Sequence, residues 1–394
     1  MLNQKEINIV KSTAPVLEEN GVLLTKHFYQ KLFKNNPEVI PLFNKANMNK
    51  GTQPEALAGA ICAYAKNIDN LEALGEAVKL ISHKHFSLKV KPEHYPIVGS
   101  NLLESIKDVL GEAATDEIVN AWSKAYFFLA DILIDAEKKL AESKNSFDGF
   151  KKFKISKVVK ESENIKSFYL KPLDEILPEF KSGQYITIRV PYAGMTTMRN
   201  YSLSSFGNND YLRISVKRED SRIDEPRGYV SNYLHENVSV YDEVEIGAPA
   251  GVFTLKERKS RSDVVFLAGG IGVTPLLAML QEAHRSKNKF SSINFVHANQ
   301  NENLQAFRDD IDKMVLENEH LTAEYFYDSL NREKKKNEYI GYINENYLSK
   351  FNKKSIFYIC GSKVFMSSVI KQLRNLGVSE DNINFEFFGP LESI

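Results

Sequence analysis

The period of the hydrophobic pattern changes twice along this 394-residue chain. Up to about Leu140 apolar residues recur at helical spacing, as at Leu57, Ile61 and Ala65, and no segment alternates as a strand does. Short alternating segments follow, and from about Asp263 apolar strands alternate with helices. The chain is also too long for one ordinary core. We therefore predict a multidomain protein with an all-α domain, an antiparallel β-barrel or sandwich, and a parallel α/β domain.

The boundaries between these domains follow from local composition. The segment Ser143–Gly149 contains small, polar and glycine residues, which is typical of a linker. The predicted domains are therefore 1–142, 150–257 and 262–394. One helix, YVSNYLHEN, is expected among the strands of the middle domain, and a final strand is expected over Phe385–Pro390.

Composition excludes several classes of protein. The chain has 51 basic and 51 acidic residues, so no net charge attracts it to nucleic acid or an anionic membrane. The N-terminal residues lack a signal-peptide pattern, and acidic residues interrupt the apolar run AYFFLADILIDA, so we expect no membrane insertion. Cys62 and Cys360 are too few for a four-thiolate iron–sulfur cluster and are interpreted as free thiols. We expect a cytoplasmic monomer.

The α/β region contains a glycine-rich stretch, GGIGVTP, between a strand and a helix. Glycines let backbone N–H groups approach a pyrophosphate, and Pro275 suits a first helical turn. The spacing Gly-x-Gly-x-x-Pro has proline in place of the third glycine of the dinucleotide fingerprint. Alone, this stretch predicts either a phosphate-binding loop or an ordinary tight turn.

Three further signals accompany this loop. The stretch Arg199–Ser202 follows a strand, and its arginine can pair with a phosphate while its tyrosine can lie on an isoalloxazine ring. Alone, it could equally be a strand with one outward arginine. A Cys-Gly pair at a strand end and the final stretch FEFFGP complete the set. In this order the four signals resemble the ferredoxin-reductase-like flavoprotein family over roughly the last 245 residues. The resemblance implies an FAD-binding barrel followed by an NAD(P)H-binding domain.

The resemblance also implies particular contacts. Ser362 stands where the family usually has proline, so we expect a local change in the nicotinamide loop. No arginine immediately follows the strand SINFVHANQNE, which favours NADH over NADPH. The implied NAD(P)-binding residues are Gly270, Ile271, Gly272, Val273, Thr274, Pro275, Cys360 and Gly361. The implied FAD-binding residues are Tyr185, Arg199, Asn200, Tyr201, Ser202, Gly228, Tyr229, Val230, Ser231, Phe387, Phe388, Gly389 and Pro390.

Three of the eight histidines, His83, His85 and His94, lie in the stretch ISHKHFSLKVKPEHY, and their spacing alone does not select a metal ligand. The helical region in front of the reductase resembles a globin, and the fusion resembles the flavohaemoglobins over the whole chain. The residues that carry the globin resemblance are Phe43, Gln53, Leu57 and His85. Flavohaemoglobins act as nitric oxide dioxygenases, which implies haem b, FAD and NADH or NADPH as cofactors and NO and O2 as substrates.

Within this resemblance His85 is the proximal haem ligand. On a helix His83 would point to another face and is expected at the surface, and His94 is expected to be solvated at a helix start. Glu137 shares an apolar stripe, so it needs a partner unless it lies exposed in a frayed last turn. The resemblance implies that Tyr95 and Glu137 bond around the far nitrogen of His85. The residues implied to tune electron transfer are Lys84 and Glu386.

On the opposite side of the haem, the resemblance implies that Tyr29 donates its hydroxyl to bound O2. Gln53 shares a stripe with Leu57 and so can reach the same pocket, which Phe43 and Leu57 would wall. Core packing explains Phe43, Gln53 and Leu57 equally well. The helix that carries Gln53 is predicted to start with a capping box, with Thr52 as cap.

The implied reaction is the oxidation of NO to nitrate by O2 with electrons from NAD(P)H passing through FAD. Two other functions are compatible with the same domains. One is an oxygen carrier or redox sensor that its reductase keeps ferrous, and the other is a reductase of hydroperoxides or quinones. The sequence contains no output domain for a sensor, and a carrier has no use for a carboxylate paired with the haem ligand.

Overall fold

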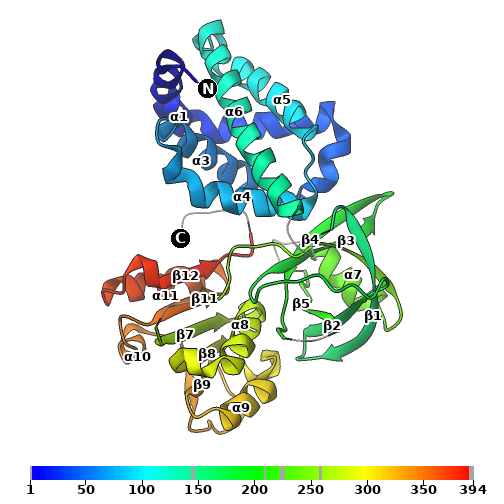
Figure 1. The fold of residues 1–394 in the computed structure, drawn as a ribbon, viewed down its shortest axis with the longest axis vertical. Coiled ribbons are helices and arrows are strands. Elements are labelled where there is room, and N and C mark those ends of the chain that lie inside the picture. The colour runs from blue at the N-terminus through cyan, green and yellow to red at the C-terminus, as the bar shows by residue number, and fades with distance from the viewer. Residues whose placement is uncertain (1, 143–146, 208–209, 222–226, 257–259, 390–394) are drawn as a thin grey trace. The chain divides into compact units, whose positions relative to one another are not determined.

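A computed structural model describes residues 2–142, 147–207, 210–221, 227–256 and 260–389. The chain forms two compact units. The first contains the chain up to Gly149 together with 189–199, and the second contains most of the remainder up to Phe388. Along the chain, the secondary structure falls into three regions. The first is all-α, the second is an antiparallel β-sheet and the third is a parallel α/β sheet, as predicted (Figure 1).

The helical region is built around one long N-terminal helix. Its start is fixed by a capping box, in which Asn3 accepts from the Glu6 N–H and the Glu6 carboxylate accepts from the Asn3 N–H. Its buried face packs Val10 and Leu24 into a core with Trp122. None of the described helices has the length and apolarity needed to cross a membrane. The main helices are α1 (Gln4–Asn35), α3 (Thr52–Lys66), α4 (Gly75–Leu88), α5 (His94–Leu110) and α6 (Asp116–Ala141), with the short α2 (Lys45–Asn49) before α3.

The predicted capping box at Thr52 is wrong. Helix α3 is capped by Gly51, whose left-handed backbone (φ 78°) turns the chain into the helix one residue earlier. Thr52 therefore lies inside the first turn, and its hydroxyl donates to the Asn47 carbonyl at 3.3 Å. Glu55 contributes its backbone N–H, which donates to the Gly51 carbonyl at 3.1 Å.

The next region is a six-stranded antiparallel sheet with strand order β4-β3-β6-β1-β2-β5. Strand β4 was not among the predicted strands, because MTTMRNYS shows no apolar alternation. It forms because Ala193 and Gly194 (φ 46° and 75°) make a two-residue turn of the kind that closes tight hairpins. The elements are β1 (Phe150–Lys160), β2 (Ile165–Pro172), β3 (Tyr185–Tyr192), β4 (Met195–Ser202), β5 (Leu212–Lys217), β6 (Glu243–Gly247) and the predicted helix α7 (Tyr229–Asn237).

The last region is a six-stranded parallel sheet with strand order β10-β9-β8-β7-β11-β12. Residues 264–268 of the central strand β7 are fully buried, as expected for a parallel strand covered on both faces. The final strand ends at Glu386, earlier than predicted, and Pro390 lies outside the described residues. The elements are β7 (Ser262–Gly269), α8 (Val273–Arg285), β8 (Phe290–Asn299), α9 (Arg308–Glu317), β9 (Leu321–Tyr327), β10 (Glu338–Ile340), α10 (Glu345–Leu348), β11 (Ile356–Cys360), α11 (Lys363–Asn375) and β12 (Ile383–Glu386).

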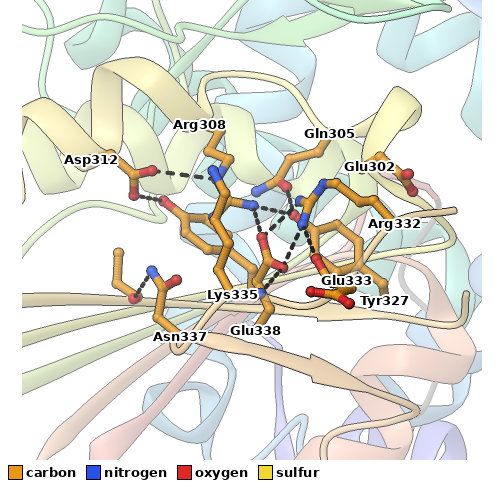
Figure 2. A network of polar contacts seen from close by, with 12 residues as sticks. Glu302, Gln305, Arg308, Asp312, Tyr327, Arg332, Glu333, Lys335, Asn337 and Glu338 are labelled. Carbon is orange, nitrogen blue, oxygen red and sulfur yellow. Dashed lines mark hydrogen bonds and ion pairs between the residues drawn. The ribbon is translucent and has the colours of Figure 1, made fainter. Parts of the chain in front are cut away.

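A buried carboxylate fixes the edge of this parallel sheet (Figure 2). The Glu338 side chain is fully buried and accepts from Arg308 Nη1 at 2.5 Å and from Arg332 Nη1 and Nη2 at 2.8 Å. The Lys335 N–H donates to the same carboxylate at 2.7 Å. The hydrogen bond from Arg332 is the largest cause that lowers the pKa of Glu338 to about 2. The carboxylate thereby ties the loop between β9 and β10 to the start of α9.

Candidate functional site

His85 lies on α4 and makes two short contacts through one ring nitrogen. Its Nδ1 is 2.9 Å from Glu137 Oε1 and 3.0 Å from the Tyr95 hydroxyl. Tyr95 donates its own proton to the same Glu137 oxygen at 2.5 Å. Because the carboxylate can only accept, Nδ1 carries the imidazole proton, which leaves Nε2 with a free lone pair. The side chain of His85 is 30% exposed and that of Glu137 only 9%, so the carboxylate is buried behind the ring.

Burial keeps the tyrosine of this triad protonated. Burial, followed by the hydrogen bond to Glu137, raises the pKa of Tyr95. Glu137 lies near the end of α6 but is only 8% exposed, so the frayed-turn alternative is wrong. Tyr126, on the same helix as Glu137, donates to the Tyr95 carbonyl at 2.7 Å. A side chain at Gly99 would lie 2.5 Å from the Tyr126 ring, so glycine permits this contact between α5 and α6.

The two other histidines of this stretch take no part in the triad. His83 is half-buried, which corrects the expected surface position, and burial lowers its pKa to about 4. His94 begins α5 as predicted, and its Nδ1 accepts from the Lys91 N–H at 3.1 Å. The side chain of Lys84, next to His85, is exposed.

Tyr29 and Gln53 form a second polar pair in the helical region. Gln53 Nε2 donates to the Tyr29 hydroxyl oxygen at 3.2 Å, so the hydroxyl proton remains available to another acceptor. Tyr29 is only 4% exposed, and burial raises its pKa to about 12. The Phe43 ring packs edge-on to Tyr29 with centroids 5.5 Å apart, and Leu57 packs against the same cluster. The four predicted pocket residues therefore belong to one group of side chains.

The predicted flavin residues Arg199–Ser202 lie at the end of β4. Arg199 is half-buried and its Nη1 donates to the Met198 carbonyl at 2.6 Å, while Asn200 Oδ1 accepts from Thr187 Oγ1 at 3.0 Å. Tyr201 is half-buried and Ser202 is buried. Tyr185 begins the neighbouring strand β3 and is 9% exposed. The hairpin thus presents a guanidinium and an aromatic ring from one strand end, a suitable pair for a phosphate and a flavin.

The start of α7 is the other predicted flavin element. Its cap is Gly228, which has no side chain to bond the first turn, and the start of a helix is a suitable place for an anion. The Ser231 hydroxyl donates to the Gly228 carbonyl at 3.1 Å. Asn232, which the sequence analysis missed, donates to the same carbonyl at 2.9 Å and to that of Glu219 at 2.7 Å. Val230 is buried, so it can contribute only its backbone, and Tyr229 is 40% exposed.

The glycine-rich loop and the Cys-Gly pair pack backbone against backbone. A side chain at Gly272 would lie 2.2 Å from the Cys360 carbonyl oxygen, and one at Gly361 would lie 3.0 Å from Gly269 Cα. Strands β7 and β11 are neighbours, which brings the two motifs together at their carboxyl ends. The cap residue of α8 is Gly272, which has no side chain to bond the first turn, so loop amides can face an anion. Among the remaining loop residues Ile271 is half-buried, whereas Val273, Thr274 and Pro275 are buried.

The C-terminal strand β12 lies beside the strand that ends in the Cys-Gly pair. Glu386 pairs with Cys360 in the β11–β12 register, and burial and then the Glu386 charge raise the pKa of the Cys360 thiol. Phe387 packs partly buried against the α/β core, and Phe388 is 46% exposed. Gly389 is exposed. Ser362 caps α11 by accepting from the Phe365 N–H at 3.3 Å, which a proline there could not do.

Three family models match the chain in the order of its domains. They are Globin over residues 26–133, Oxidoreductase FAD-binding domain over 152–255 and Oxidoreductase NAD-binding domain over 266–371. A globin joined to such a reductase is a haem- and flavin-dependent oxidoreductase that uses a nicotinamide nucleotide.

Full-length relatives identify the family. A Flavohemoprotein of Rhodopirellula baltica is 44% identical over all of this chain and 99% of its own. That of Bacillus subtilis is 41% identical over 100% of this chain and 99% of its own. A crystal structure of flavohemoglobin from Malassezia yamatoensis, with bound FAD and heme, matches with a TM-score of 0.86 and 26% identity over 98% of this chain and 100% of its own. This chain belongs to the flavohaemoprotein family.

Replacing Arg199 with alanine is expected to weaken FAD binding. A charge-assisted hydrogen bond contributes about 1.5–3 kcal/mol, so the FAD dissociation constant should rise roughly ten- to a hundredfold. Titration of FAD-free protein with FAD measures the change. Arg218→Ala is the matched control. Arg218 lies in the same predicted domain, and its ion pair among the described residues is with Asp220. Equal affinities in Arg199→Ala and the unmodified protein would remove Arg199 from the flavin site.

Proposed function

We propose that this protein is a nitric oxide dioxygenase that converts NO and O2 to nitrate with electrons from NADH or NADPH delivered through FAD. The observation that carries the proposal is the hydrogen-bonded triad of His85, Tyr95 and Glu137, with its contacts of 2.5–3.0 Å. Membership in the flavohaemoprotein family supports a haem site and a reductase in one chain.

The residues of the helical region fit a haem. His85 keeps Nε2 free because Nδ1 donates to Glu137, and its ring is partly exposed while the carboxylate is buried. His85 would therefore hold the iron, and Phe43 and Leu57 would line the pocket. When bound, the haem supplies the iron at which O2 is activated toward NO.

The triad distinguishes this activity from simple oxygen carriage. A buried carboxylate that accepts from Nδ1–H draws the imidazole toward imidazolate and makes Nε2 a stronger donor. Strong electron donation by an axial ligand favours chemistry at the O–O bond over reversible binding. Tyr95 holds Glu137 in place through a proton that burial keeps on the hydroxyl. The pairing has a clear use in an enzyme and none in a carrier.

On the other side of the pocket, Tyr29 is the candidate donor to substrate oxygen. Gln53 donates a hydrogen bond to the hydroxyl oxygen of Tyr29, so the hydroxyl proton of Tyr29 points toward a different acceptor. The pKa of about 12 keeps that proton in place over the physiological range. Tyr29 would thus stabilise negative charge that develops on O2.

The reductase residues account for the electron supply. The amides at the starts of α7 and α8 would hold the pyrophosphates of FAD and NAD(P)H, and Arg199 and Tyr201 would hold the flavin side. When bound, FAD would supply the conversion of a two-electron donor into single electrons. One NAD(P)H therefore serves two molecules of NO and two of O2, giving two nitrates, NAD(P)+ and one proton.

Anaerobic reduction of the purified protein by NADH, followed by rapid mixing with O2 and NO, tests the proposal. We expect NO to disappear and nitrate to accumulate with one nitrate per NO. Release of O2 unchanged would instead establish a carrier. Oxidation of NADH by added hydroperoxide, with no nitrate from NO, would establish a peroxide reductase.

Replacing Tyr29 with phenylalanine should accelerate the release of O2. The change keeps the ring but removes a hydrogen bond to a charged group, worth about 1.5–3 kcal/mol, so the off-rate should rise roughly ten- to a hundredfold. Stopped-flow O2 dissociation measures it, alongside NO decay at low and saturating O2. The loss of NO consumption should be greater at low O2.

Tyr64→Phe is the matched control for this variant. Tyr64 is also buried in the helical region, but its hydroxyl donates to the Ala125 carbonyl at 2.8 Å in the core. Haem content, FAD content and dye reduction by NADH should be preserved in both variants. If O2 release and NO decay in Tyr29→Phe equal those of the unmodified protein, Tyr29 is a packing residue.

A further inference from the structure

His297 lies in β8 next to the glycine-rich loop, although that loop follows β7. In the β7–β8 register His297 is opposite Ala268, one strand over from the loop's first residues. Its side chain is fully buried, and its Nε2 is 3.0 Å from the carbonyl oxygen of Gly270. A single side chain from a neighbouring strand therefore contacts the backbone of the loop.

The chemistry of this contact fixes the tautomer of the ring. A carbonyl oxygen only accepts, so His297 Nε2 must carry a proton and donate it. Burial lowers the pKa of His297 to about 4, so the ring is neutral at ordinary pH and Nδ1 is unprotonated. Nδ1 is buried, and no donor among the described residues reaches it.

The accepting carbonyl belongs to the residue that turns the strand into the helix. Gly270 has a left-handed backbone (φ 53°) and precedes the uncapped start of α8. Its carbonyl also accepts from the Val273 N–H. With two donors, the Gly270 carbonyl is held in one direction, and that direction fixes the peptide plane whose far side is the Ile271 N–H.

A merely structural role does not account for this histidine. A buried nitrogen without a partner destabilises the fold, and an apolar side chain in the same place would avoid that cost. Strand β8 is otherwise rich in buried apolar residues, including Phe295 and Val296. The position therefore keeps a costly polar group whose one hydrogen bond is to the candidate nucleotide loop.

We propose that His297 is a positioning residue for the nicotinamide nucleotide, which holds the glycine-rich loop through its Nε2–H bond to Gly270 so that loop amides meet the pyrophosphate. The inference rests on the nucleotide site proposed above. It concerns binding of the dinucleotide and does not depend on the reaction with NO.

A pair of amide substitutions tests the proposal. In His297→Gln the side-chain nitrogen can lie near the position of Nε2 and still donate to Gly270, whereas in His297→Asn it lies near Nδ1 and cannot. The measurement is NADH-dependent ferricyanide reduction by the full chain with FAD bound. We expect the KM for NADH to rise roughly three- to tenfold in His297→Asn, as the loss of one hydrogen bond implies, with kcat unchanged. His297→Gln should restore the KM.

His297→Leu separates positioning from folding. It removes the unpaired nitrogen, so its thermal unfolding midpoint should equal or exceed that of the unmodified protein, while its KM for NADH rises as in His297→Asn. An unchanged KM in both His297→Asn and His297→Leu would overturn the proposal. Equal rises in KM in His297→Gln and His297→Asn, each with a lower unfolding midpoint, would also overturn it. If the unmodified protein shows no NADH-dependent reduction of ferricyanide, the nucleotide site itself is wrong.

Discussion

The His85→Ala variant is expected to fold and to bind FAD but to retain no haem. Among the described residues of the helical region, only His85 has an imidazole whose Nδ1 is held by a buried carboxylate, so we expect no other side chain to replace its Nε2 in holding the iron. NADH-dependent dye reduction should survive, because the candidate FAD and nucleotide residues all follow β1 along the chain, outside the helical region. The haem-to-protein ratio, read from visible absorption of the purified variant, measures the effect.

His83→Ala and His94→Ala are the controls for this loss. Both residues lie in the same stretch, yet neither contacts Tyr95 or Glu137 through the hydrogen bonds that define the triad. Both variants should purify with haem and with the five-coordinate ferrous spectrum. A full haem complement in His85→Ala would assign the iron to a different residue and remove the basis of the proposed activity.

The second large effect is expected on stability, from Glu338→Ala. The change leaves the guanidinium groups of Arg308 and Arg332 without the buried carboxylate that they share (Figure 2). Breaking a buried ion pair by removing one partner costs about 3–5 kcal/mol. Urea unfolding followed by a probe in the α/β domain measures the loss. Glu333→Ala is the matched control, because this exposed glutamate of the same loop should change stability by less than about 0.5 kcal/mol.

The same carboxylate predicts a pH dependence. Its pKa in the folded protein, about 2, lies below the ordinary value of 4.5, so its contribution is fully present above pH 4.5 and is lost as the pH falls toward 2. The shift corresponds to about 3 kcal/mol at 1.36 kcal/mol per unit. In Glu338→Gln this component of acid destabilisation should be absent. An identical fall in stability between pH 4.5 and 2 in the two proteins would contradict the assignment.

Elements with strong local patterns were predictable from the sequence. The helix YVSNYLHEN has the predicted limits, and the buried strands of the α/β domain were found because their apolar runs are continuous. Strand β4 was missed because its formation depends on the turn at Ala193 and Gly194 rather than on alternation. The capping box at Thr52 failed because glycine supplied a backbone conformation that the pattern does not show.

Some contacts of the candidate site could also be predicted from the sequence, and others could not. That Glu137 has a partner could be expected, because a carboxylate on an apolar stripe needs one, whereas its pairing with His85 was implied only by the resemblance to flavohaemoglobins. The contacts of Asn232 and His297 could not be expected, since the carbonyls of Glu219 and Gly270 that they bond lie 13 and 27 residues away along the chain. The Glu338 cluster was also invisible, because its arginines are 30 and 6 residues away along the chain.

The short strand β10 has a consequence for how the protein behaves at high concentration. It forms one border of the parallel sheet and has three residues, of which Ile340 is 63% exposed. An open border with unpaired backbone groups can recruit a second chain and start aggregation, and brevity together with nearby charge opposes this. Glu338 and its two arginines anchor this border. Loss of the carboxylate should therefore free the loop between β9 and β10 and also expose an aggregation-prone edge strand. Self-association of a variant that lacks the carboxylate would then begin at the sheet, far along the chain from His85.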